Sequence, residues 1–370
     1  MNTPRRTAAE FLGNKTLRYV FGFGMAVATV CAAQQPHVVN AKVESRSAAS
    51  GLDREFRTLV QSQVQPAWIG YAVPVIPGDH TMCCCDGRYE MLRGGCALEG
   101  EHSMTMRSDD SKRANLEAPE SMFVLFRAAE RRVTKIRTYS EDCELDAGGL
   151  TLYWLTGVKP AESVALLATF VRPADEDESG GQRLTSGALT AIALTNDGAA
   201  DRALDQFAAS GQPEHLREQA AFWLGSARGR HGYETLARMI REDPDERFRK
   251  HATFALSVSR ESDAIAALIS TAKNDRAAEV RGQALFWLAQ KAGQKAATAI
   301  TDAIENDPET EVKKRAVFAL SQLPRDEGVP LLIHVARTNR NHEVRKQAMF
   351  WLGQSNDPRA LAFIEEVLLR

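Results

Sequence analysis

The sequence carries almost no net charge and shows no motif of a common enzyme class. Its 46 Lys and Arg residues are balanced by 48 Asp and Glu residues, and the formal net charge is -2 at pH 7. Nucleic-acid-binding domains usually carry a strong positive excess, so we expect no nucleic-acid partner. The sequence contains no nucleophile elbow, phosphate-binding loop or zinc-protease helix. We therefore expect no enzyme activity and no cofactor.

The chain also lacks an apolar run of the roughly 20 residues that a transmembrane helix needs. Its longest apolar segment, Tyr19–Ala33, ends in small residues and is followed by polar Gln34. Basic residues precede this segment: Arg5, Arg6, Lys15 and Arg18. The pattern predicts a signal peptide over residues 1–33 and an exported protein, periplasmic or extracellular. An uncleaved N-terminal anchor is the alternative, and no other membrane contact is expected.

Cysteine is missing from everything after Cys143. One of the six cysteines, Cys31, lies in the predicted signal peptide, which leaves five in the mature chain. Cysteines of exported proteins usually pair, and an odd number leaves one free or pairing between chains. A metal site or a redox-active thiol is the alternative, although three adjacent cysteines lack the spacing of a zinc knuckle. The candidate disulfide residues are Cys83, Cys84, Cys85, Cys96 and Cys143.

Residues 34–158 are predicted to form a small β-rich, cysteine-containing domain with a leading helix at Leu52–Gln61. Segments rich in β-branched and aromatic residues predict its strands. They are Ala67–Ile76, Met122–Phe126, Val133–Tyr139 and Thr151–Leu155. A helix at Glu162–Phe170 is expected to begin the next domain, residues 159–370, or to cap its open end.

A short aromatic-aliphatic tag recurs every 32 residues in the second half of the chain. Its copies are Phe222-Trp223-Leu224-Gly225, Phe254-Ala255-Leu256-Ser257, Phe286-Trp287-Leu288-Ala289, Phe318-Ala319-Leu320-Ser321 and Phe350-Trp351-Leu352-Gly353. A weaker sixth copy, Ala188–Ile192, lies one period upstream, as is usual for a terminal unit. A fixed period of this size predicts stacked supersecondary units.

Each unit is predicted to be a helical hairpin. Within one copy Val280, Ala284 and Leu288 follow helical spacing, and a second apolar helix fills the rest of the unit. These second helices are expected at Ala200–Ala209, Tyr233–Ile240, Ala264–Ala272, Ala296–Ile304, Val329–Ala336 and Ala360–Leu369. Start signals share one register before the tag-bearing helices, and they predict N-cap residues at Asp243, Asp275, Asp307 and Asn339. Asp243 with Glu246 further predicts a capping box.

The two-helix unit resembles a HEAT repeat, and its short form is similar to the HEAT-like repeats of the phycobilisome lyase type. In that family a turn Asp and a helix Arg stack into a polar ladder between units. The resemblance implies a mainly α fold, a right-handed α-solenoid of about six helical hairpins after the β-rich domain. It also implies a structural ladder of Arg217, Arg249, Arg281, Lys313 and Arg345 with Asp243, Asp275 and Asp307. Lys313 and Asn339 depart from the family pattern, so a weaker ladder is expected in the last units.

The Trp residues of the tag, Trp223, Trp287 and Trp351, alternate with Ala255 and Ala319. Large and small residues packing between units is one interpretation, since aromatic stripes at helical spacing usually belong to cores. The other is that the three rings are candidate anchors for an extended protein or peptide partner.

Three functions are compatible with these patterns. The first is an exported scaffold that binds protein or peptide through the surface of the solenoid. The second is a metal-binding or redox module in the cysteine-containing region. The third is an enzyme on a HEAT-like array, as in the phycobilin lyases or in deoxyhypusine hydroxylase, whose several His-Glu dyads hold a di-iron centre. This chain has one such dyad, His342-Glu343, and an export signal disagrees with the cytosolic location of the lyases. We favour the scaffold.

Overall fold

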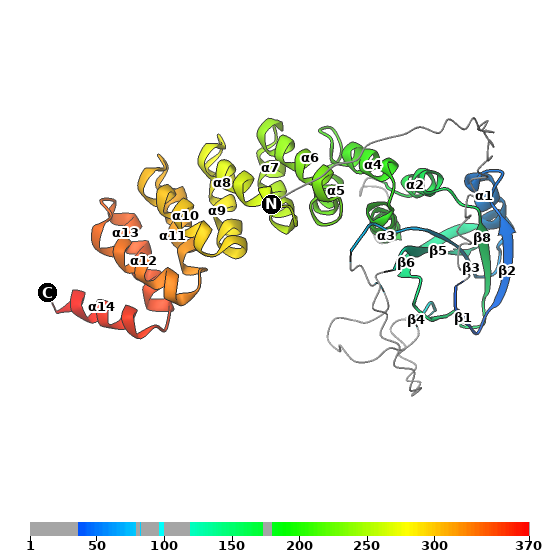
Figure 1. The fold of residues 1–370 in the computed structure, drawn as a ribbon, viewed down its shortest axis with the longest axis horizontal. Helices are drawn as coiled ribbons and strands as arrows, with labels where there is room; N and C mark the ends of the chain where they lie inside the picture. Colours follow the sequence, from blue (N-terminus) through cyan, green and yellow to red (C-terminus); the bar gives the residue numbers. More distant parts are fainter. Residues whose placement is uncertain (1–35, 79–81, 83–95, 100–118, 173–179, 370) are drawn as a thin grey trace, which may run out of the picture. The chain divides into compact units, whose positions relative to one another are not determined.

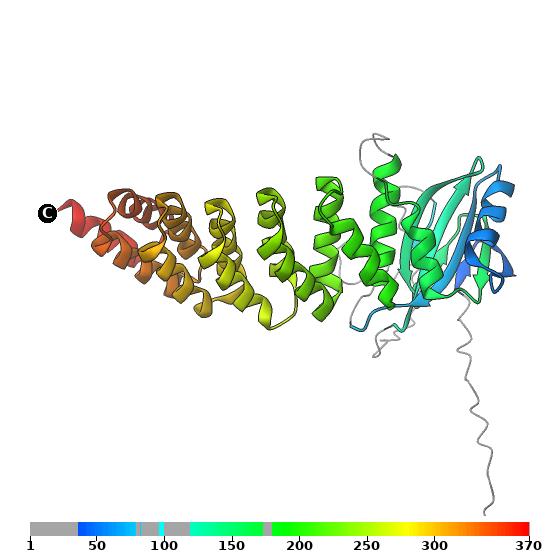
Figure 2. The same ribbon diagram turned by 90° about the horizontal axis from the view of Figure 1, so that it is seen from above.

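The computed structural model describes residues 36–78, 82, 96–99, 119–172 and 180–369. Two β-sheets and two helices are followed by a run of twelve helices in these residues (Figures 1 and 2). The predicted fold class, a β-rich region that precedes an α-helical repeat, is therefore confirmed.

The larger sheet has five strands. Their order is β2 (Lys42–Ser47), β8 (Thr151–Thr156), β3 (Ala67–Pro74), β5 (Ser121–Ala129) and β6 (Arg132–Ser140). Strands β2, β8 and β3 run parallel, whereas β3, β5 and β6 are antiparallel neighbours. A small second sheet joins β1 (Val38–Val39), β7 (Leu145–Asp146) and β4 (Cys96–Ala97). Strand β2 was not predicted, because it lies at the sheet edge and its polar residues are mostly exposed.

The two faces of the five-stranded sheet serve different cores, because side chains alternate along a strand. One face, which includes Tyr71 and Phe126, packs with α1 (Leu52–Ser62) and α2 (Pro160–Ala168). The other face carries Trp68 and Trp154 in a separate buried cluster, together with Cys96 and Cys143.

The helical repeat comprises six hairpins in chain order. They are α3 (Gly180–Leu194) with α4 (Gly198–Ala208), α5 (Glu214–Ala227) with α6 (Gly229–Glu242), α7 (Glu246–Val258) with α8 (Asp263–Asn274), α9 (Ala278–Ala292) with α10 (Gln294–Asn306), α11 (Thr310–Ser321) with α12 (Arg325–Thr338), and α13 (His342–Gln354) with α14 (Pro358–Leu368). The start and end of each predicted second helix lie within a few residues of the observed bounds.

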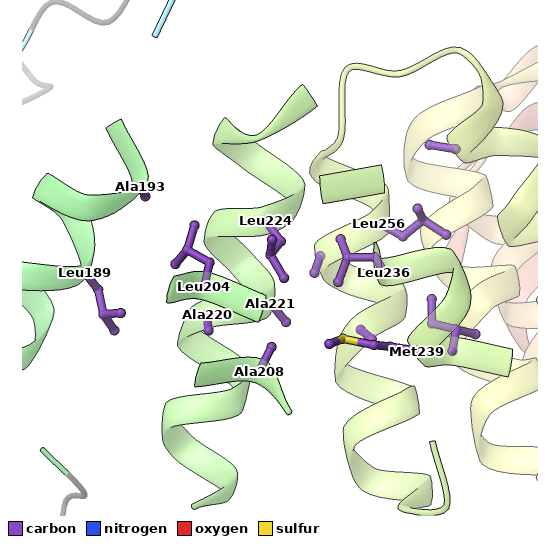
Figure 3. Packing of buried hydrophobic residues seen from close by; sticks show 14 of the residues in the cluster. Leu189, Ala193, Leu204, Ala208, Ala220, Ala221, Leu224, Leu236, Met239 and Leu256 are labelled. Atoms are coloured by element: carbon purple, nitrogen blue, oxygen red, sulfur yellow. The ribbon is translucent and has the colours of Figure 1, made fainter. Parts of the chain in front are cut away.

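The hairpins stack so that like helices become neighbours. The odd-numbered helices α3 to α13 contact one another in sequence, and so do the even-numbered helices α4 to α14. Small residues allow the close approach: Ala220 is fully buried, and an added Cβ on Gly225 would stand 1.9 Å from the carbonyl oxygen of Ala255. Leucines such as Leu204, Leu224 and Leu236 fill the space between helices (Figure 3).

The sheet is joined to the first hairpin by backbone and core contacts. The amide of Ile76 donates to the carbonyl of Leu194, and the amide of Asn196 donates to the carbonyl of Pro74, both at 2.9 Å. Gly187 on α3 lies against the backbone of Ile136 on β6. One buried apolar cluster accordingly extends from the sheet through the helical hairpins.

The predicted N-cap residues are wrong by two positions. The N-cap positions of α7, α9, α11 and α13 are Asp245, Ala277, Glu309 and Asn341, of which only Asp245 and Asn341 accept a side-chain cap bond. Each predicted residue instead ends the preceding helix. Asp243 accepts a hydrogen bond from the amide of Asp245 at 2.9 Å, and Asp275, Asp307 and Asn339 repeat this turn. Asp and Asn form such turns as readily as caps, so composition alone did not separate the two. Because Asp243 is not the N-cap of α7, the predicted capping box of Asp243 with Glu246 is also wrong.

Candidate protein-binding surface

Eight aromatic side chains form a connected row along the odd-numbered helices. We call this set the aromatic row: Phe222, Trp223, Phe254, Phe286, Trp287, Phe318, Phe350 and Trp351. Phe222 stacks on Phe254 with ring centroids 6.1 Å apart, and Phe286 stacks on Phe318 at 5.9 Å. The contacts are thus continuous from α5 to α13.

The row lies at the boundary between core and solvent. The Leu of each tag is buried, whereas the Phe of each tag remains partly exposed, and Phe350 is 53% exposed. The three Trp rings are partly buried and pack against the core cluster. The structure is therefore compatible with both predictions for the Trp residues, packing and anchoring. Each Trp ring packs against the core and is still partly exposed.

The alternation of Trp and Ala has a direct packing explanation. Ala255 and Ala319 are fully buried, and on the helices that carry them the Phe ring contacts the Trp of the next unit. Phe254 lies 4.9 Å from Trp287, and Phe318 lies 4.9 Å from Trp351, centroid to centroid. The aromatic row consequently repeats every second unit.

Several buried polar atoms on these helices have no hydrogen-bond partner among the described residues. Four of them belong to Gln219 (Oε1), His251 (Nε2), Trp287 (Nε1) and Trp351 (Nε1). Buried polar groups of folded proteins nearly always have a partner, and indole N–H groups usually find one. These atoms, one acceptor, two donors and one imidazole nitrogen, are enclosed by the surrounding side chains.

Charged side chains flank the aromatic row and were not singled out from the sequence. His251 lies edge-on to Phe254 and places Nδ1 3.5 Å from Glu218. Lys250 binds Glu279 at 3.2 Å, and Arg315 binds the same carboxylate from α11. These positions change from unit to unit, so the repeat itself gave no signal for them. These residues give the surface beside the aromatic row its charges.

The Asp and Arg residues of the predicted ladder lie between units. Arg249 donates to both carboxylate oxygens of Asp275 at 3.0 Å, and Arg281 binds both oxygens of Asp307 at 2.8 and 3.0 Å. Arg217 binds Asp243, also 26 residues ahead, through one carboxylate oxygen only. These ion pairs are almost completely buried. The Asp275 carboxylate, as hydrogen-bond acceptor, raises the pKa of Arg249 further above its ordinary value.

The ladder changes in the last units. Lys313 donates to the carbonyl of Glu305 at 2.8 Å instead of an Asp carboxylate. Arg345 donates to the carbonyl of Asn339, whose side chain donates to Glu305 at 3.3 Å. Backbone carbonyls thus replace the carboxylate where the sequence departs from the repeat.

The predicted cysteine framework falls partly outside the described residues. Cys96 and Cys143 are buried in the cluster beneath Trp68 and Trp154. Cys83, Cys84 and Cys85 lie outside the described residues, so the disulfide framework stays a prediction. Within the described part of the chain, no group of three or more His, Cys, Asp and Glu side chains is placed to hold a metal ion.

The remaining sequence-based candidates give no further site. His342 and Glu343 are both exposed in the first turn of α13. Among the described residues, no helix is both long and apolar enough to cross a membrane. The predicted signal segment, residues 1–33, lies outside the described residues.

Stacked helical hairpins with a buried Asp–Arg ladder define an α-solenoid of short repeats. A comparison with protein families agrees with this architecture: a model of HEAT repeats matches residues 200–289 and 297–370. The predicted resemblance to HEAT repeats is therefore confirmed over these residues.

Several solved structures are similar to parts of this chain. Human deoxyhypusine hydroxylase in complex with glycerol is 15% identical, with a TM-score of 0.30, over 56% of this chain and 90% of that chain. The complex of CpcE and CpcF of phycocyanin lyase from Nostoc sp. PCC7120 is 21% identical, with a TM-score of 0.28, over 56% and 80%. A designed armadillo repeat protein is 15% identical, with a TM-score of 0.26, over 54% and 100%. A comparison with curated proteins found no match.

Proposed function

We propose that the chain is a scaffold that binds a protein or peptide partner along the aromatic row, and that it acts by binding rather than by catalysis. The observation that carries this proposal is the row itself: partly exposed rings in contact across five units. Large, rigid aromatic side chains supply most of the energy of protein interfaces for little loss of side-chain freedom. Repeat arrays commonly bind their partners on such extended surfaces.

The charged side chains beside the row favour a polypeptide as the bound molecule. Lys250, Glu279 and Arg315 lie beside partly exposed aromatic rings, and a polypeptide offers both apolar and charged side chains to such a surface.

The rigid framework lowers the cost of binding. The ladder ion pairs and the leucine packing fix the helices before a partner arrives, so that little ordering of the scaffold is needed. A scaffold with flexible binding loops would instead lose part of its binding free energy when those loops become ordered.

The proposal is tested by selecting peptides from a random displayed library on the purified chain. Selected peptides are then titrated by calorimetry against the wild type and against a Phe254→Ala/Phe286→Ala variant. Loss of two central rings is expected to weaken binding about 30-fold or more, equivalent to the ~2 kcal/mol of a hot spot. Circular dichroism establishes that the variant is folded.

The matched control is Leu361→Ala/Val367→Ala on α14, where both side chains are exposed at 59% and 44% but lie outside the aromatic row. This control should bind the selected peptides like the wild type. Selection of no peptide, or equal weakening by both double variants, would refute the aromatic row as the binding surface.

We further propose that the scaffold works outside the cytoplasm. The support is the basic segment followed by the apolar stretch Tyr19–Ala33 and small residues before Gln34. Expression in a bacterial host followed by intact-mass analysis tests it: the exported chain should begin near Gln34. A full-length mass in the soluble cytoplasmic fraction would contradict export.

A further inference from the structure

At the end of two of the Trp-bearing helices, a basic side chain contacts the C-terminal end of the preceding odd-numbered helix. Arg228, which ends α5, donates to the carbonyls of Ala193 and Thr195 at the end of α3, at 3.0 and 2.9 Å. In the next such pair, Lys291 of α9 places Nζ 2.6 Å from the carbonyl oxygens of Ser257 and Ser259, at the end of α7. Carbonyl groups at the C-terminus of a helix attract cations, because they have no partner within the helix and carry the negative end of its dipole.

The third pair, α11 with α13, has the carbonyls but not the cation. Ser321 and Leu323 stand two repeat units after Ser257 and Ser259, and neither carbonyl accepts a hydrogen bond within the described part of the chain. The residue two units after Lys291 is Ser355, whose short side chain donates to the carbonyl of Leu352 at 2.7 Å.

A pocket of about 240 Å³ opens at this place, between α11, α12 and α13. Its apolar wall suits the four-carbon chain of a lysine, and the end of α11 supplies the unpaired carbonyls. The apolar lining consists of Leu320, Leu323, Val329, Leu332 and Trp351. Because Trp351 also belongs to the aromatic row, the pocket adjoins the surface on which a partner is proposed to lie.

One charged side chain lines the pocket. Arg325 stands where the previous pair has Glu261, two units earlier. Arg325 is exposed, and its charge acts on Asp357, whose pKa is held at about 2 mainly by Arg359 and to a smaller extent by Arg325. Asp357 forms its ion pair with Arg359, so the charge of Arg325 is not neutralised at the pocket and opposes a bound cation.

We propose that this pocket receives the side-chain ammonium group of a lysine from the bound partner, in the place that Lys291 occupies one pair earlier. The ammonium would donate to the carbonyls of Ser321 and Leu323, and its alkyl chain would lie against Trp351. The source of the lysine rests on the proposed scaffold function, whereas the pocket is testable without any partner.

The test follows the indole N–H resonance of Trp351 in the full-length chain, assigned with a Trp351→Phe variant. The probes are Nα-acetyl-lysine methylamide and its Nε-acetylated analogue, which has a similar chain but no charge. We expect a saturable shift with the charged probe and affinity at least about tenfold lower for the neutral one, because hydrogen bonds from a charged donor are stronger than those from a neutral one.

Two variants and one control sharpen the result. Ser355→Lys restores the internal cation and should abolish the response. Arg325→Glu restores the acidic residue of the earlier pair and should tighten binding severalfold. Gly353→Lys adds the same charge outside the pocket, with open space around its Cβ position, and should respond like the wild type.

No shift of the Trp351 resonance, an equal response to both probes, or an undiminished response in Ser355→Lys would each overturn the proposal. Such a failure leaves the scaffold function standing if the selected peptides still bind the aromatic row. Conversely, a lysine-specific response together with no peptide binding would retain the pocket and refute the scaffold.

Discussion

Arg249 on α7 binds both carboxylate oxygens of Asp275, 26 residues further along the chain, at 3.0 Å each. The same guanidinium donates to the carbonyl of Asp243 at 3.0 Å. One side chain thereby connects the turn before its own helix with the turn of the next unit. Arg281 repeats the arrangement with Asp307 and with the carbonyl of Asp275, so the ladder links three successive turns.

Removal of one ladder partner should strongly destabilise the repeat. Because Arg249 is buried, Arg249→Ala leaves the Asp275 carboxylate buried and unpaired, and the expected loss is about 3 kcal/mol or more. Urea unfolding followed by circular dichroism measures it. The matched control is Arg230→Ala, which breaks exposed pairs with Asp263 and Glu234 and should cost far less than the buried pair. Equal losses in the two variants would contradict a structural ladder.

The repeat register predicted most of the helical architecture, because a fixed period reports stacking directly. Leu224, Leu256 and Leu288 recur at one position, and all are fully buried. The same register placed Arg249 and Asp275 but could not pair them, since the contact joins neighbouring units. It also misplaced the caps, because an Asp that forms a turn and an Asp that caps a helix look alike in sequence.

The candidate binding surface was only partly predictable. The tag singled out Trp223, Trp287 and Trp351, but the exposed side of the row is formed as much by the Phe residues. The pocket of the α11–α13 pair depends on a residue that is absent, Ser355 where Lys291 stands earlier. The sequence could not predict this pocket, because the contacts of Lys291 with two backbone carbonyls are seen only in the structure.

Two glycines that lie inside helices should differ in their tolerance of alanine. In Gly225→Ala the new Cβ would meet the backbone carbonyl of Ala255 at 1.9 Å, so the helices must separate, at a cost of roughly 1–3 kcal/mol. In Gly282→Ala the contact is the flexible side chain of Arg315, which can move away, and the better helix propensity of alanine offsets the change to within ~1 kcal/mol. Urea unfolding of both variants checks this. A larger loss for Gly282→Ala would show that the Arg315–Glu279 pair is structurally important.

The last tag offers an internal comparison between anchoring and packing. Phe350 is 53% exposed, so Phe350→Ala should lower the free energy of unfolding by about 0.5 kcal/mol or less. Trp351 packs on the core and contacts both Phe318 and Phe350, so Trp351→Ala should cost about 2 kcal/mol or more. Denaturant unfolding of the pair measures the difference. If the two variants lost equal stability, Phe350 would not be available as an anchor.

Acid should loosen the cap of α14 only well below the usual range for a carboxyl group. Asp357 accepts from the amide and the guanidinium of Arg359, and these contacts lower its pKa from 3.8 to about 2. A carboxyl group whose pKa is lowered by folding binds protons less tightly in the folded chain, so its contribution to stability is complete above about pH 4. That contribution is lost as the pH falls from about 4 toward 2.

The chemical shift of the Arg359 amide, followed by NMR against pH, should therefore titrate near pH 2. Asp357→Asn keeps an acceptor for the cap but has no titrating proton, and its shift should stay flat. A wild-type midpoint near 3.8 would mean that Arg359 does not hold the carboxylate in solution.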